Sequence, residues 1–275
     1  MSIELPPGMA DYSEASPPPK NRQIVLLLSF FVGLTIALFL SVDLMVGVLI
    51  GWIPPGVERQ LGALIVPAFE QQAAPSSAQD TLNQLLDRLK PHLSAEQQQR
   101  DYKVLYVPDE TVNALAIPGD RIILYRGLIE QAESENELMM VLGHELGHFA
   151  HRDHLRQLGR GLLMQITISS LFGDISGIQS IALSAAQTIG NSRFSQNQEY
   201  KADEMGVTLL QKIYGQVAGA TDFFARLSEK KDLPIDFLTT HPNPGKRVQR
   251  LEKLIQQNGW TVGDRSPVAG SLKTP

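Results

Sequence analysis

The stretch "HELGHFAHRDH", residues 144–154, holds four of the six histidines of this 275-residue chain. Four residues apart on an α-helix, His144 and His148 project from one face with their Cβ atoms about 5–6 Å apart. Two imidazoles at that spacing can bind one zinc ion together. Glu145 lies beside the pair and can take the proton of a metal-bound water as that water attacks a carbonyl. The stretch therefore predicts a hydrolytic metal site on a helix.

The residues before this stretch favour a helix. Ser134 and Glu137 form a capping-box pattern directly before the apolar run "LMMVLGHELGHFAH", so we expect the helix to begin near Ser134. The alternative interpretation is a solvated helix with two surface histidines, and the capping pattern makes it the weaker one.

A catalytic zinc site needs a third protein ligand, and the sequence offers two candidates. His154 lies six residues after His148, a spacing that some zinc peptidases use with a glycine turn in between, but here His151 stands at the glycine position. Glu199, in "EYKAD", can reach the metal from a second helix, and Asp203 one turn later can accept the other N–H of a ligating histidine. Alone, these two acids would equally suit a solvated acidic face. Together with the HELGH stretch, they favour Glu199 as the third ligand.

Composition limits the other chemistry that the chain can perform. It has no cysteine, which excludes Cys-ligated zinc, thiol catalysis and a disulfide framework. Apolar residues make up 43% and charged residues 19%, as in ordinary folded proteins. The formal net charge is −5 and no basic cluster is interleaved with aromatic residues, so no nucleic-acid partner is expected.

An uncharged apolar run, "IVLLLSFFVGLTIALFLSV", covers residues 24–42. At about 1.5 Å per residue it nearly crosses a hydrocarbon core of roughly 30 Å. We interpret 24–53 as one transmembrane anchor in contact with lipid, and a buried core helix is the weaker alternative because an amphipathic stripe is missing. Lys20 and Arg22 precede the run, so the positive-inside bias favours a catalytic domain on the extracytoplasmic side of a bacterial inner membrane.

The rest of the chain predicts an α+β fold that is mostly helical. Three β-rich runs predict a small antiparallel sheet: 102–108, 111–118 and 121–127. The expected units are, in order, a disordered tail (1–23), the anchor (24–53), a linker (54–77), a folded domain (78–260) and a second disordered tail (261–275). A second apolar region, 161–190, is interpreted as buried helices or a hairpin over the site, with membrane contact as the alternative.

Four segments, in order, carry a family resemblance: "NALAIPGDRIILYRGL" (113–128), "ELMMVLGHELGHFAHRDHL" (137–155), "FSQNQEYKAD" (194–203) and "TTHPNPGKRVQRL" (239–251). They are similar to segments of the CAAX prenyl protease/HtpX-type family of membrane-associated zinc metallopeptidases, which are gluzincins. The resemblance implies a zincin-like domain and one Zn²⁺ per chain. It also implies His144, His148 and Glu199 as zinc ligands and Glu145 as the general base.

The same resemblance implies that His241 donates a hydrogen bond to the oxyanion formed during hydrolysis; a plain loop histidine before a proline turn is the alternative. Asn113, Ala114 and Ala116 would begin an edge strand to which an extended substrate adds as a further strand, and a purely structural edge strand is the equal alternative. The family usually has Pro-Gly-Gly in this segment. Asp120 replaces the second glycine, which leaves the geometry of the turn open.

The expected function is that of a membrane-anchored zinc metalloendopeptidase acting on unfolded or misassembled polypeptides in protein quality control. The alternative is a catalytically weak or inactive chaperone or binding protein that keeps the peptidase fold. An intramembrane protease is excluded because charged residues flank the motif on both sides.

His151 is expected to be a packed neighbour of the site, and His154 to lie in a charged, solvated turn with Arg152, Asp153 and Arg156.

Overall fold

The structure is a computed structural model that describes residues 21–73, 75–172, 193–229 and 236–273. The chain divides into two compact units, Met1–Met45 and Val46–Pro275. Helix α1 (Asn21–Trp52) runs from the first unit into the second. By length and composition it is the one helix in the described part of the chain that can cross a membrane. The expected first tail, 1–23, falls mostly outside the described residues.

Helix α2 (Pro55–Glu70) occupies most of the stretch that we expected to be a linker. The linker prediction over 54–77 is therefore corrected. Proline is favoured in the first turn of a helix, where its missing N–H is not needed, and Pro55 takes that place. The inner face of α2 is buried, and each such side chain contributes about 1.5–3 kcal/mol to folding. The buried apolar residues of this face are Ile65, Val66 and Phe69.

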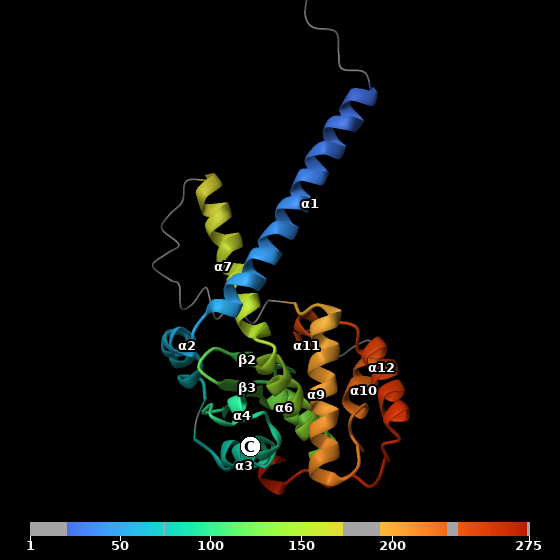
Figure 1. Cartoon of the computed structure of the whole chain (residues 1–275). Helices are drawn as coiled ribbons and strands as arrows, with labels where there is room; N and C mark the ends of the chain where they lie inside the picture. Colours follow the sequence, from blue (N-terminus) through green and yellow to red (C-terminus); the bar gives the residue numbers. More distant parts are fainter. Residues whose placement is uncertain (1–20, 74, 173–192, 230–235, 274–275) are drawn as a thin grey trace, which may run out of the picture. The chain divides into compact units, whose positions relative to one another are not determined.

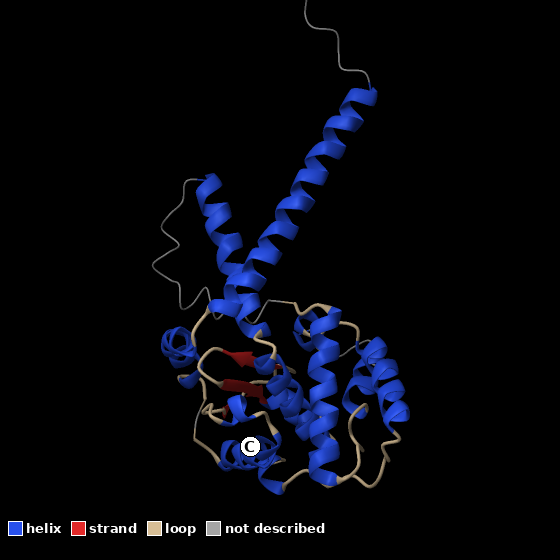
Figure 2. Ribbon diagram, in the orientation of Figure 1, coloured by secondary structure: helices blue, strands red, loops and turns tan. Residues whose placement is uncertain are grey.

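The predicted sheet is present (Figure 2). Its strand directions are mixed rather than antiparallel throughout. The strands are β1 (Lys103–Val107), β2 (Ala114–Ile117) and β3 (Arg121–Tyr125), in the order β1-β3-β2. β2 and β3 pair antiparallel through a tight turn, whereas β1 pairs parallel with β3. The connection over 108–113 takes the chain past β3 before β2 begins, so β1 and β3 run in the same direction.

The β2–β3 turn explains how Asp120 substitutes for a glycine. Both Gly119 and Asp120 have positive φ, 89° and 61°, and Asp is one of the few non-glycine residues that adopt this conformation readily. Its carboxylate also forms an ion pair with Arg100. The departure from Pro-Gly-Gly is thus compatible with the same turn and adds a charge to it.

Both faces of the sheet are covered. On one face, side chains such as Val104, Tyr106 and Ile122 join the main core with α3 (Ser77–Leu89). On the other face, the alternate residues Leu105, Val107, Leu115 and Ile123 pack with α2 and with Leu158. Burial on both faces accounts for strands that are apolar at nearly every position.

From the sheet outward, the helices form successive layers (Figure 1). Helix α6 (Glu135–Ala150) packs on β2, α9 (Gln196–Tyr214) on α6, and α12 (Pro244–Asn258) on α9, with α10 (Asp222–Glu229) on α12. Small residues bring α6 and α9 close. A Cβ on Gly147 would lie 2.6 Å from Ala202 Cα, and one on Gly143 would lie 2.9 Å from Gly206 Cα. This close contact places the HELGH motif against the EYKAD motif.

The remaining elements are short, apart from α7. They are η1 (Lys90–His92), α4 (Ala95–Gln98), α5 (Arg126–Gln131), α7 (Asp153–Phe172), α11 (Asp236–Thr240) and η3 (Gly270–Leu272). Helix α7 covers the first part of the apolar region 161–190. The prediction for the rest of that region falls on 173–192, outside the described residues.

The second tail, expected to be disordered over 261–275, is ordered along 261–273 and lies on the domain. The carbonyl of Thr261 accepts from the Val217 N–H at 2.9 Å, and that of Ser266 accepts from the Glu135 N–H at 2.9 Å. The second bond satisfies one of the N–H groups that a helix start leaves without a partner. Val268 and Leu272 are buried, so the disorder prediction is corrected.

Candidate metal centre

Helix α6 begins as its sequence predicts. The Ser134 side chain accepts from the Glu137 N–H at 3.3 Å. The carboxylate of Glu137 does not return to the Ser134 N–H as in a complete capping box; it accepts from the Glu133 N–H at 3.2 Å and pairs with Arg226. The helix ends at Ala150, and the chain turns into α7. Two turns of α6 thus carry the histidine pair into the interior.

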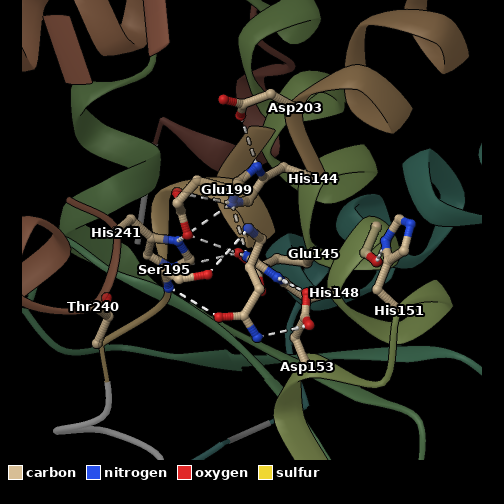
Figure 3. Close-up of polar contacts among 12 residues, drawn as sticks. His144, Glu145, His148, His151, Asp153, Ser195, Glu199, Asp203, Thr240 and His241 are labelled. Carbon is tan, nitrogen blue, oxygen red and sulfur yellow. Dashed lines mark hydrogen bonds and ion pairs between the residues drawn. The ribbon is translucent and has the colours of Figure 1, made fainter. Parts of the chain in front are cut away.

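Four side chains from three parts of the chain converge in the interior (Figure 3). Their ligand atoms all lie within 4.8 Å of one another, and all four residues are buried: His144, His148, Glu199 and His241. The Nε2 atoms of His144 and His148 are 3.1 Å apart. Glu199 Oε1 lies 3.5 Å from His148 Nε2 and 3.2 Å from His241 Nδ1. The structure therefore brings together the three predicted ligands and adds His241 to them.

The Nδ1 atoms of His144 and His148 each lie beside a carboxylate. Asp203 Oδ1 lies 2.9 Å from His144 Nδ1, and Asp153 Oδ2 lies 3.1 Å from His148 Nδ1. Because an ionised carboxylate only accepts, each Nδ1 carries a proton and each Nε2 turns its lone pair inward. Two inward lone pairs 3.1 Å apart repel each other unless a proton or a metal cation lies between them. This donor set fits a metal ion.

The place of Asp203 agrees with the prediction from the sequence, whereas the place of Asp153 was missed. Asp153 was expected in a solvated turn, and it is fully buried. The expectation failed because it took this charged turn to face solvent. Arg152, with a φ of 56°, instead ends the helix and turns Asp153 toward His148.

Arg247 is a second residue that the sequence analysis missed. It is buried, its Nε and Nη2 donate to Asp203 at 2.8 and 2.6 Å, and its Nη1 lies 2.7 Å from Glu199 Oε2. Burial would raise the pKa of both carboxyls, but the guanidinium together with the neighbouring histidines outweighs burial and holds both pKa values below their ordinary range. The sequence carried a usable signal: two carboxylates expected beside one metal site favour a nearby cation, and "KRVQR" lies in the last family segment.

The two motif histidines of the site have pKa values that shift in opposite directions. Burial would lower the pKa of His148, but contacts with Asp153 and Glu199 outweigh it and raise this pKa to about 10. Burial and the nearby Arg247 guanidinium lower the pKa of His144. Without a metal, His148 is therefore the ring that keeps an extra proton, and a metal ion must displace that proton.

Glu145 has an unusual environment for a carboxylate. Its side chain is fully buried, and neither of its oxygens has a hydrogen-bond partner in the part of the chain that the structure describes. Its Oε1 lies 3.8 Å from His241 Nε2. A buried carboxylate without a partner is strongly unfavourable in an apolar setting, so this group requires a polar or cationic ligand beside it.

Comparison with known proteins identifies the fold around this centre. The family model of peptidase family M48 matches residues 76–255, more than half of the chain. The chain belongs to peptidase family M48. This membership confirms the family resemblance.

Three curated M48 relatives show how far the likeness extends. A putative beta-barrel assembly-enhancing protease of Vibrio cholerae is 29% identical over 191 residues, which cover 64% of this chain and 40% of that protein. Metalloprotease LoiP of Escherichia coli is 29% identical over 164 residues, covering 58% and 64%. Mitochondrial metalloendopeptidase OMA1 of Arabidopsis thaliana is 27% identical over 151 residues, covering 54% and 31%. The chain thus spans less than two thirds of the length of each of these relatives.

In this M48 chain, His241 lies between the three predicted ligands and Glu145. Its ring stacks on Phe237 with centroids 4.5 Å apart. Its Nδ1 is 3.2 Å from His144 Nε2, and its Nε2 faces Glu145. The ring therefore touches both the metal-binding atoms and the expected base, and its role as an oxyanion donor stays a prediction.

The predicted substrate residues Asn113, Ala114 and Ala116 lie at the start of the edge strand β2. All three are buried. The Asn113 side chain accepts from Thr240 Oγ1 at 3.3 Å, and His241 Nε2 lies 3.4 Å from the Ala114 carbonyl. The segment that carries His241 thus contacts this end of the strand, and the substrate role stays a prediction.

The two remaining motif histidines lie apart from the donor set. His151 is half-buried, and its Nδ1 donates to the Gly147 carbonyl at 2.8 Å, which closes the last turn of α6. His154 was expected in a solvated turn, and this is corrected: it is fully buried, with Nε2 2.8 Å from Glu58 Oε1. The prediction failed because it could not foresee that α2 supplies a buried acid.

Proposed function

We propose that this chain is a membrane-anchored zinc metalloendopeptidase that hydrolyses peptide bonds in unfolded or misassembled polypeptides. The observation that supports this best is the buried carboxylate of Glu145, without a hydrogen-bond partner among the described residues, beside four converging donor atoms. A general base that acts on a metal-bound water needs this position.

The donor types favour zinc. Two imidazoles and one carboxylate, with the fourth position left for water or substrate, are the ligand set of many catalytic zinc sites. His144, His148 and Glu199 would hold one ion per chain. When bound, the ion lowers the pKa of its water to about 7 and polarises the scissile carbonyl.

The other residues of the site each have a separate role in peptide hydrolysis. Glu145 takes the proton of the attacking water and passes it to the leaving amine. His241, beside Glu145, donates to the oxygen that gains negative charge. Asp203 and Asp153 hold the two imidazoles with Nε2 directed inward.

The anchor and its orientation are part of the same proposal. Helix α1 has the length and composition of a membrane span, and Lys20 and Arg22 stand before its apolar part. Cytoplasmic flanks carry more Lys and Arg. This charge bias supports a folded domain on the extracytoplasmic side of a bacterial inner membrane. Residues 24–53 would be the part of the chain in contact with lipid.

The substrate class is carried over from the relatives' names. The Vibrio cholerae relative, and others of Yersinia pestis and Escherichia coli, bear the name beta-barrel assembly-enhancing protease. A protease whose name refers to assembly fits a role in quality control. We therefore expect unfolded or misassembled polypeptides as substrates, rather than a single folded protein.

The decisive experiment is Glu145→Gln in the full chain, assayed on casein. Cleavage should fall by about 10²–10⁴-fold because proton transfer is lost, while one zinc ion per chain stays bound. Glu130→Gln, on an exposed side chain of α5, is the matched control and should cleave normally. If Glu145→Gln cleaves like the parent, the assigned base is wrong. If the parent binds zinc and prevents aggregation without cleaving, the chain is an inactive chaperone instead.

A further inference from the structure

The turn at the junction of α6 and α7, defined as residues 151–154, carries three consecutive side chains that reach three different places. Arg152 contacts the end of α1, Asp153 contacts the metal centre, and His154 contacts α2. Arg152 has a φ of 56°, a left-handed conformation that costs a non-glycine residue about 1–2 kcal/mol. Such a conformation persists where the surrounding contacts determine it, and here those contacts come from three directions.

Arg152 binds one carbonyl in the last turn of α1 and one just after the helix. Its Nη1 donates to the Ile50 carbonyl at 2.7 Å, and its Nη2 donates to the Ile53 carbonyl at 2.9 Å. A helix end leaves such carbonyls without intrahelical partners, and arginine side chains can satisfy them. These residues belong to the second compact unit, Val46–Pro275. The guanidinium therefore joins the end of the apolar helix to the turn.

Packing supports the same junction. Val46 and Ile50 are buried, and a Cβ added to Gly159 of α7 would lie 3.3 Å from Val46 Cγ1. A larger residue at Gly159 would push against the end of α1. The segment 46–53 is thus held by apolar contact as well as by hydrogen bonds.

Asp153 connects the turn to a metal-ligating residue (Figure 3). Its Oδ2 accepts from His148 Nδ1 at 3.1 Å. Its Oδ1 accepts from Gln198 Nε2 at 2.7 Å and from Arg156 Nη1 at 3.1 Å. Both oxygens are therefore occupied, and the carboxylate has one orientation in which it can hold the His148 ring.

His154 fixes the other side of the turn. Its Nε2 donates to Glu58 of α2 at 2.8 Å, and Glu58 Oε2 lies 3.5 Å from Arg152 Nη2. Glu58 also pairs with Arg100. Because α2 begins three residues after α1 ends, both contacts of the turn lead to the same short stretch of chain.

We propose that Asp153 is a positioning residue for His148, and that Arg152 makes this positioning depend on where the end of α1 lies. Arg152 keeps its left-handed backbone conformation while its guanidinium is held by the Ile50 and Ile53 carbonyls. Asp153 follows it directly in the chain, so a shift of these carbonyls that releases Arg152 redirects the Asp153 carboxylate. Metal–ligand distances tolerate only about 0.2 Å. The metal affinity of the site therefore depends on the position of residues 46–53. This inference rests on the metal site proposed above.

The test measures metal binding to the full chain in detergent, without any peptide cleavage. Zinc affinity is measured by competition with a coloured chelator, and Co²⁺ is used as a second probe whose visible spectrum reports ligand geometry. The variants are Asp153→Asn, Arg152→Ala and Arg152→Lys. Arg59→Ala, on the exposed face of α2, is the matched control. Melting temperatures are recorded for every variant.

Asp153→Asn should weaken zinc binding about 10- to 100-fold, the effect expected for a group behind a ligating histidine, and should change the Co²⁺ spectrum. Arg152→Ala should weaken zinc binding about 3- to 30-fold. Arg152→Lys should recover part of the loss, because an ammonium can still donate to the carbonyls, and Arg59→Ala should bind as the parent does. Should Asp153→Asn fail to fold, Asp153→Glu replaces it and should change the Co²⁺ spectrum through its longer side chain.

Three results are separable. Unchanged affinity and Co²⁺ spectrum in the Asp153 variant overturn the positioning role. A lower melting temperature of Arg152→Ala with unchanged affinity and spectrum overturns the link to α1 and leaves a structural contact only. A parent chain that binds no zinc refutes the proposed function itself, before either variant is compared.

Discussion

Two buried clusters of this molecule contain the same kinds of residue and behave differently. One is the metal centre. The other, the Glu58 cluster, consists of Glu58, Arg100, Asp120, Arg152 and His154. In the Glu58 cluster each carboxylate meets a guanidinium or a histidine N–H. In the metal centre, two histidine nitrogens face each other at 3.1 Å and one carboxylate has no hydrogen-bond partner in the described part of the chain.

The difference lies in charge balance. The metal centre buries the carboxylates of Glu145, Asp153, Glu199 and Asp203 with one fully buried guanidinium, that of Arg247. Arg156 reaches Asp153 from the surface. Even with His148 protonated, these carboxylates outnumber the buried cations, and a surplus of buried negative charge is costly unless a further cation enters. The Glu58 cluster supplies its own cations. A histidine beside a glutamate thus marks a metal site only where the buried carboxylates outnumber the protein cations.

The largest expected effect separates the two clusters by metal content. Glu199→Gln removes a ligand and should abolish stoichiometric zinc binding. Glu58→Gln should leave one zinc per chain in the presence of excess metal, because Glu58 contacts no ligand atom. Metal analysis of the purified full chains measures both. Equal zinc in the two variants would remove the distinction between the clusters.

The next effect concerns the shared guanidinium. Arg247→Met leaves Asp203 and Glu199 without their cation and should destabilise the metal-free protein by about 3–5 kcal/mol. Saturating zinc should return part of this loss, since the ion supplies positive charge to the same carboxylates. Arg250→Met, one turn further on the exposed side of α12, is the control and should change stability little. Denaturation of the parent and of both variants, with and without zinc, measures their free energies of unfolding. A loss of equal size at both positions would contradict the role of Arg247 as the cation of Asp203 and Glu199.

The smallest effect is a pH dependence specific to the Glu58 cluster. Burial would raise the pKa of Glu58, but His154 and Arg100 outweigh burial and lower this pKa to about 2 from an ordinary 4.5. A lowered folded-state pKa adds stability above the unfolded value, and this is lost as the pH falls from about 4.5 toward 2. Glu58→Gln should therefore cost roughly 2 kcal/mol at pH 6 and progressively less below pH 4.5. Unfolding measured at several pH values checks this, and a gap that stays constant down to pH 2.5 would refute it.

Local patterns predicted the parts of the site that local chemistry determines. Ser134 begins α6, and the four-residue spacing brings His144 and His148 to one face. Four residues also separate Glu199 from Asp203 on α9, so both reach the centre. Each of these follows from helix geometry within a few residues, and the structure places each as expected.

Contacts between distant segments escaped prediction. Glu58 and His154 are 96 positions apart, and Arg247 and Asp203 are 44 apart; no periodicity relates such pairs. Asp153 is near His148 in sequence, but its place depends on one left-handed residue, Arg152, for which the sequence has no glycine signal. The strand directions likewise depend on how the chain crosses between β1 and β2, which tertiary packing decides.

Two segments were misjudged for a simpler reason. The Pro-Pro-Gly at 54–56 resembles a turn, although proline also starts helices, and α2 begins there. The polar stretch after residue 260 lacks periodicity, yet its backbone binds Val217 and the start of α6. Backbone hydrogen bonds leave little trace in composition, so polar segments that dock by their main chain are easily taken for tails.

The measurement that tests the central claim most directly is an anomalous scattering map at the zinc edge, from crystals of the full chain grown with zinc. The account predicts one strong site bonded to His144, His148 and Glu199 at about 2.0–2.2 Å, and no site beside Glu58 and His154. A zinc ion in the Glu58 cluster, or none among the four converging donors, would contradict it.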